Sequence, residues 1–158
     1  MVNGEAIPAT ALRNRLLQQQ VAAAQGMPTA GPGEIVNALV EDMLLRQEAH
    51  RRGLECTEGQ LREFVSFHLA NLTASDRKWL SETYGVPDEY LESSPTIARL
   101  YSGACTEVQV GRAIAAERSD LPPEEAVDAF LAQLRSGSRI QIRQDVVNAT
   151  VDEISSAR

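Results

Sequence analysis

Apolar residues recur at three- and four-residue steps along most of this chain, the spacing that places them on one face of an α-helix. The stretch 34–72 shows the pattern most clearly and predicts two consecutive helices. Gly53 is the expected cap at the end of the first helix, and Thr57 is the expected N-cap of the second. The first apolar stripe contains Ile35, Val36, Leu39, Val40, Met43, Leu44 and Gln47, and the second contains Leu61, Phe64, Val65, His68, Leu69 and Leu72.

Similar spacing predicts further helices on both sides of this pair. One begins at Pro8, a short one begins at Ser75 or Asp76 as its N-cap, and another short one begins near residue 88. A long helix begins at Pro95, and a last one spans residues 124–136. The glycine- and proline-rich stretch 26–33 is expected to be a loop. The apolar set of the long helix is Ile97, Leu100, Tyr101, Ala104, Val108 and Ile114.

Two short segments near the ends of the chain are predicted to be extended. Residues 2–7 contain a bend at Asn3-Gly4, and residues 139–143 alternate polar and apolar side chains. Since a strand this short needs a partner, we expect the two to pair in a small sheet. The expected fold is therefore mainly α, with residues 1–143 as one domain, built from 1–118 and 122–143. The polar tail 144–158 is expected to be either frayed or helical.

Composition excludes several classes of function. With 158 residues and 43% hydrophobic residues, the chain can bury a core without a metal. A net charge of −7 disfavours binding to nucleic acid or to an anionic membrane surface. No apolar run is long enough to span a membrane, and no secretory signal is recognisable. The spacing of His and Cys predicts no metal site, and no cofactor-binding glycine motif occurs.

The two cysteines leave two alternatives open. Cys56 and Cys105 either form one disulfide or remain two thiols packed as small apolar residues. A bridge across this separation would stabilise the fold by about 4 kcal/mol in the chain-entropy model.

Four sequence segments carry a resemblance to a known family. They are VNGEAI at 2–7, LLRQEA at 44–49, GLECTE at 53–58 and RIQIR at 139–143. Together they resemble the N-terminal chaperone domain of the SurA/PrsA group of extracytoplasmic foldases. The resemblance implies a helical chaperone domain whose terminal strands pair, in the periplasm or cell envelope. Members of that family commonly carry parvulin prolyl-isomerase domains where this chain has only residues 116–122, so we expect no isomerase activity. No Walker loop, dinucleotide glycine pattern or HExxH motif occurs, so we expect no other enzyme activity either.

The resulting functional hypothesis is an ATP-independent chaperone that binds unfolded or extended apolar segments of exported proteins. Large apolar side chains are the expected contacts, because they offer adaptable area to varied segments. Two alternatives remain: a prolyl-isomerase family member that works with a separate catalytic domain, and a dimerisation or interaction module that forms a homodimer. The candidate peptide-binding residues are Met27, Trp79, Tyr84, Tyr90, Leu91 and Tyr101, each of which could instead fill the core.

Overall fold

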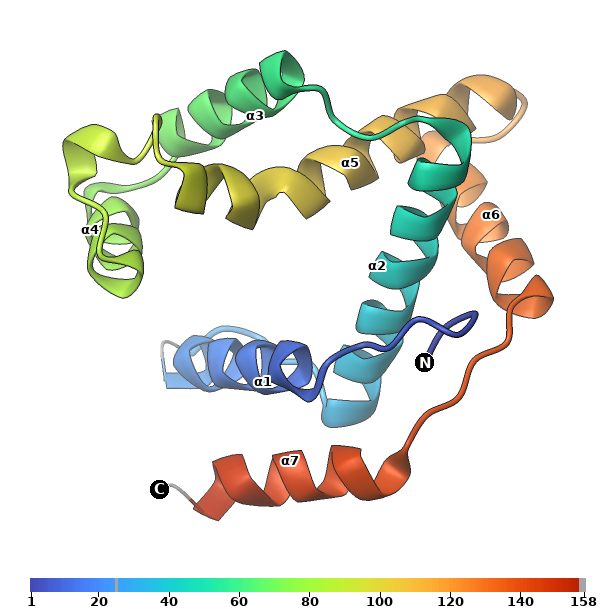
Figure 1. The fold of residues 1–158 in the computed structure, drawn as a ribbon, viewed down its shortest axis with the longest axis horizontal. Helices are drawn as coiled ribbons and strands as arrows, with labels where there is room; N and C mark the ends of the chain where they lie inside the picture. Colours follow the sequence, from blue (N-terminus) through green and yellow to red (C-terminus); the bar gives the residue numbers. More distant parts are fainter. Residues whose placement is uncertain (25, 157–158) are drawn as a thin grey trace. The chain divides into compact units, whose positions relative to one another are not determined.

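The computed structural model describes residues 1–24 and 26–156, which form seven α-helices and one 3-10 helix (Figure 1). The prediction of a mainly helical fold is confirmed. In chain order the elements are α1 (Ala9–Ala24), α2 (Pro32–Arg52), α3 (Glu58–Ala70), α4 (Ala74–Tyr84), η1 (Asp88–Tyr90), α5 (Pro95–Glu117), α6 (Pro123–Gly137) and α7 (Gln144–Ser156).

Contacts within the chain define two compact units. Unit 1 comprises Met1–Leu45 and Asp128–Arg158, and unit 2 comprises Arg46–Val127. The boundaries fall inside α2 and inside α6, so each of these helices contributes residues to both units.

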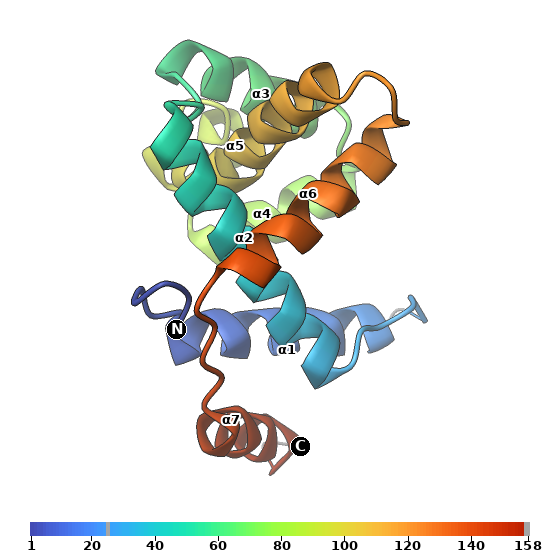
Figure 2. The ribbon, with the colours of Figure 1, turned by 90° about the vertical axis from the view of Figure 1, so that its right-hand side faces the viewer.

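Unit 2 is built on the packing of α3 against α5, which lie side by side in both views (Figure 1 and Figure 2). Helix α4 and the segments on either side of η1 supply further apolar residues to the same core. Its buried residues are Val65, Leu69, Leu80, Leu91 and Ile97, and Leu61, Leu72, Tyr84, Val86 and Tyr101 pack against them.

Local hydrogen bonds fix where the helices of unit 2 begin and end. Thr57 caps α3 as predicted, and its side chain accepts a hydrogen bond from the Gln60 backbone N–H. The predicted cap of α4 is wrong: Thr73 is the N-cap, and Asp76 is its partner three residues later. The side chains of Thr73 and Asp76 each accept a hydrogen bond from the backbone N–H of the other residue. This reciprocal arrangement places the cap two residues earlier than Ser75.

Gly53 ends α2 as predicted. Its φ of +65° lies in the left-handed region, which costs glycine little. The Gly53 N–H donates to the His50 carbonyl at 3.3 Å, and the Leu54 N–H donates to the Ala49 carbonyl at 2.9 Å. These two bonds form a Schellman motif, which satisfies carbonyls that the helix leaves unpaired.

The predicted apolar set of α5 is only partly buried. Ile97 and Ile114 are buried, together with Cys105 and Val110. Leu100 is 42% exposed and Val108 is 37% exposed, and Ala104 between them is exposed as well. The helical spacing was therefore right, but half of that set lies outside the core.

The two terminal segments meet in unit 1 through a single antiparallel bridge between Val2 and Ile140. The described residues contain no sheet, so the predicted two-stranded sheet is not confirmed. The bend at Asn3-Gly4 gives the physical reason, because both residues have positive φ and turn the chain immediately after Val2. Val2 then bonds back to Glu5, and the extended segment ends after one pair.

The core of unit 1 forms around this bridge. Val2 is fully buried together with Val40, Met43 and Leu44 of α2, and Ile7, Leu134 and Ile140 pack against them. Residues 144–156, for which the sequence left two alternatives, form the helix α7. This helix packs against α1 (Figure 1 and Figure 2) and buries Thr150 and Ile154.

Candidate binding surfaces

The six candidate peptide-binding residues fall into an exposed group and a core group. Met27, Trp79 and Tyr90 are exposed, by 50%, 46% and 59%. Leu91 has no exposed surface and belongs to the core of unit 2, so it cannot contact a ligand in this conformation. Tyr84 and Tyr101 are half-buried and pack against that same core.

Elements of unit 2 hold two of the exposed residues. Trp79 lies on α4 and Tyr90 on η1, two elements joined by an ion pair of 2.9 Å between Arg77 Nε and Asp88 Oδ1. Met27 belongs to unit 1, in the turn region that follows α1. The six residues are therefore divided between the two units, one in unit 1 and five in unit 2.

Sequence reasoning missed an aromatic cluster on α3 and α5. The ring of His68 lies 4.0 Å from Phe64, 5.5 Å from Phe67 and 5.6 Å from Tyr101, measured between centroids. His68 Nδ1 is 2.8 Å from the Phe64 carbonyl, which can only accept, so this nitrogen carries a proton. Burial, with a smaller effect of nearby Tyr84, raises the pKa of Tyr101.

Phe67 is the outermost member of this cluster. It is 67% exposed, more than any other large apolar side chain in the described part of the chain. The signal was present in the sequence, because Phe67 stands outside the apolar stripe of its helix. An apolar residue off the stripe is one that the core does not require.

Unit 1 contains a groove with largely apolar walls. Its volume is about 280 Å³, and the segment 141–143 lines it together with the N-terminal segment, α1, α2 and α7. A second hollow of about 430 Å³ adjoins it, and the two share Val36, Ile142 and Val147 as lining residues. Ile142 is 46% exposed, so its side chain lies at the surface of both hollows. The lining residues of the groove are Met1, Ala6, Ile7, Pro8, Ala9, Leu12, Val36, Leu39, Val40, Gln141, Ile142, Arg143, Val146 and Val147.

The two cysteines form a disulfide, which decides between the alternatives that the sequence left open. Their Cα atoms are 6.0 Å apart, within the usual range for such a bridge. Cys105 is fully buried in α5, and the Cys56 N–H donates to Thr106 Oγ1 at 3.4 Å. The bridge ties the turn between α2 and α3 to the middle of α5.

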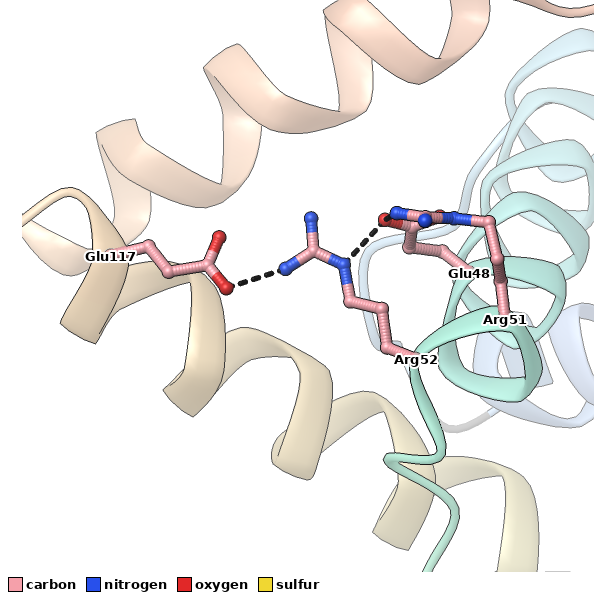
Figure 3. A network of polar contacts seen from close by, with 4 residues as sticks. All are labelled: Glu48, Arg51, Arg52 and Glu117. Carbon is pink, nitrogen blue, oxygen red and sulfur yellow. Dashed lines mark hydrogen bonds and ion pairs between the residues drawn. The ribbon is translucent and has the colours of Figure 1, made fainter.

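A network of charged side chains in unit 2 links two helices, α2 and α5. Figure 3 shows Arg52 between two carboxylates, with Nε 2.5 Å from Glu48 and Nη1 2.6 Å from Glu117. Glu48 is buried and also accepts two hydrogen bonds from Arg51, at 2.6 and 2.7 Å. The bond from Arg51 holds the pKa of Glu48 below its ordinary value against the opposing effect of burial, and Arg52 adds to the lowering. The network joins α2 to α5 and keeps the carboxylate ionised.

The part of the chain that the structure describes contains no cluster of three or more His, Cys, Asp or Glu side chains that could hold a metal ion. None of the helices in residues 1–24 and 26–156 is long and apolar enough to cross a membrane. Comparison with known proteins finds no matching family model, no matching curated protein and no matching solved structure.

Proposed function

We propose that this protein is an ATP-independent chaperone-like domain that binds unfolded or extended apolar segments of exported proteins. The observation that carries the proposal is the groove of about 280 Å³ in unit 1, whose walls are mainly aliphatic and which lies at the surface. A concave apolar surface of this size accepts a few aliphatic side chains without a catalytic group.

Exposed apolar side chains elsewhere support the same proposal. Leu17 and Met27 of unit 1 and Phe67, Trp79 and Tyr90 of unit 2 are each more than 40% exposed. Scattered contacts of this kind bind many different segments weakly. The net charge of −7 helps a protein with such a surface to stay in solution.

The disulfide supports a location outside the cytoplasm. Bridges of this kind persist in the periplasm and in other oxidising compartments, and cytosolic reductants keep most thiols reduced. The extracytoplasmic part of the proposal rests on this bridge and on the resemblance of the four sequence segments.

The experiment that tests the proposal measures how the protein affects aggregation of a reduced, unfolded model client, followed by light scattering. Prolyl isomerase activity is assayed on the same preparation with a proline-limited refolding reaction. We expect suppression of aggregation without ATP and no acceleration of refolding. Absence of suppression at several-fold molar excess would reject the chaperone function, and accelerated refolding would favour the isomerase alternative.

One observation favours a second candidate, a homodimer that forms through α5. Leu100, Ala104 and Val108 are spaced four residues apart, so they share one exposed face of this helix. Two copies of such a face can pack against each other. Sedimentation velocity over a range of concentrations tests this, with Leu100→Ser expected to shift the protein to monomer if the face is the interface.

A further inference from the structure

The extended segment that follows α6 uses only one of its two edges. Gln141 exchanges backbone hydrogen bonds with Met1, at 2.9 Å and 2.7 Å. The Arg139 carbonyl accepts from the Asn3 N–H at 2.9 Å. Backbone groups of successive residues in a strand point to opposite edges, so those of Ile140 and Ile142 point away from the N-terminal segment.

Within the described part of the chain, the backbone groups on this second edge have no hydrogen-bond partner, and the side chain of Ile140 is half-buried against the core of unit 1. Among residues 1–24 and 26–156, the backbone groups of Ile140 and Ile142 make no hydrogen bond. Figure 1 shows the chain between α6 and α7 as an extended stretch without helix, and Gln141, Ile142 and Arg143 are all exposed. An open edge of this kind is a template for a further strand.

Of the two hollows described above, the one of about 430 Å³ lies beside this edge, whereas the N-terminal segment lines the groove of about 280 Å³. This hollow is lined by α2, α7 and Ile142, with no lining residue from the N-terminal segment, which places it on the unpaired side. Val36, Ile142 and Val147 connect it to the apolar groove. An incoming chain that bonds to the edge would therefore have an apolar wall within reach of its alternate side chains.

We propose that one extended apolar segment of a client polypeptide adds as a strand to the edge formed by Ile140 and Ile142, with every second side chain directed at Val36, Ile142 and Val147. The proposal rests on the chaperone function and specifies the conformation of the client. An incoming helix would satisfy its own backbone and leave the edge unpaired, whereas an extended chain pairs with the edge and places alternate side chains against the hollow of about 430 Å³. At about 3.3 Å per residue, the edge accommodates a segment of about four residues.

The first test uses a fluorescein-labelled peptide of alternating valine and threonine, followed by fluorescence anisotropy. Two further peptides carry N-methyl groups, one on the valines and the other on the threonines. Because N–H groups alternate between edges, methylation in one register should weaken binding at least fivefold, and in the other it should change binding less than about twofold. Equal effects of the two registers, or no effect of either, would overturn strand addition.

The second test distinguishes the contribution of the backbone N–H of residue 142 to peptide binding from the contribution of its side chain. Ile142→Pro removes the N–H, and the residue before a proline favours the extended conformation that Gln141 already needs. Ile142→Ala is the matched control, because it shortens the side chain and keeps the N–H. We expect the proline variant to bind the peptide at least fivefold more weakly than the alanine variant, with the same circular dichroism spectrum.

The remaining outcomes distinguish the inference from the function on which it rests. Suppression of aggregation with no peptide binding would overturn strand addition and leave the chaperone function standing. If the wild-type protein neither suppresses aggregation nor binds the peptide, strand addition and the chaperone function are both overturned. If the free protein sediments as a dimer that the peptide dissociates, the edge pairs with a second copy, and the client is not its natural occupant.

Discussion

Cys56 and Cys105 are bridged across 49 residues, and their disulfide holds the turn after α2 against the middle of α5. Because one end of the bridge is fully buried and the other lies in a turn, it connects an irregular segment to the core of unit 2. The segment that it fixes also carries Thr57, the N-cap of α3.

The disulfide should therefore contribute strongly to stability. In the chain-entropy model, a bridge that closes this loop stabilises the folded state by about 4 kcal/mol. We expect Cys56→Ala/Cys105→Ala to lower the free energy of unfolding by about that amount in urea denaturation. Dithiothreitol should lower the stability of the wild-type protein similarly and leave the double variant unchanged. Equal unfolding midpoints for oxidised and reduced wild-type protein would contradict this.

The Glu48 network makes a prediction about pH. Arg51 and Arg52 lower the pKa of Glu48 in the folded state. The ionised carboxylate therefore stabilises the fold at pH values above the pKa that Glu48 has in the unfolded state. This contribution begins to decrease when the pH falls below 4.5, the ordinary pKa of this carboxyl group, and it is lost when the pH has fallen through the lowered pKa of the folded state. Glu48→Gln should lower stability by about 1–3 kcal/mol at pH 7, and the difference from wild type should shrink at acid pH. A difference that is independent of pH would contradict the assignment.

His50 should titrate above its ordinary pKa. Its Nδ1 lies 2.8 Å from Glu55 Oε1, and this hydrogen bond raises the pKa of the imidazole. The charged form is favoured in the folded state, so its contribution is present at low pH and disappears as the pH rises through the folded pKa. An NMR titration should show a lower His50 pKa in Glu55→Gln. The same His50 pKa in wild type and variant would show that the pair does not form in solution.

Two residues on α3 provide a matched test of the core. Leu69 is 2% exposed and Phe67 is 67% exposed, although both are large apolar residues on one helix. Leu69→Ala should cost about 2–5 kcal/mol of unfolding free energy, whereas Phe67→Ala should change it by less than about 0.5 kcal/mol. If Phe67→Ala proves as destabilising as Leu69→Ala, Phe67 is buried against something else in solution.

The sequence predicted the helices better than it predicted the surfaces. Local chemistry determines helix ends, so Thr57 and Gly53 could be recognised as caps from their neighbours alone. The cap of α4 was missed because Thr73 and Ser75 both satisfy the residue preference, and only the reciprocal bonds with Asp76 decide between them.

Burial depends on which element covers a helical face, and the 3.6-residue period does not contain that information. Leu100 and Val108 follow the spacing of core residues but remain exposed. Tyr90 and Leu91 are adjacent in the chain, yet one is exposed and the other fully buried, because the short 3-10 turn directs them differently. The groove was not predictable either, since it forms only when α7 packs on α1 beside the segment 141–143.

The central claim, that the groove in unit 1 holds unfolded clients, is tested most directly by a light-scattering assay with Ile142→Asp. This side chain is 46% exposed, so the change should leave the thermal unfolding midpoint nearly unaltered and place a charge on the apolar wall. We expect the wild-type protein to suppress aggregation of a reduced client and the variant to lose most of that effect, while Phe67→Ser retains more of it. Equal suppression by wild type and Ile142→Asp would contradict the assignment of the groove.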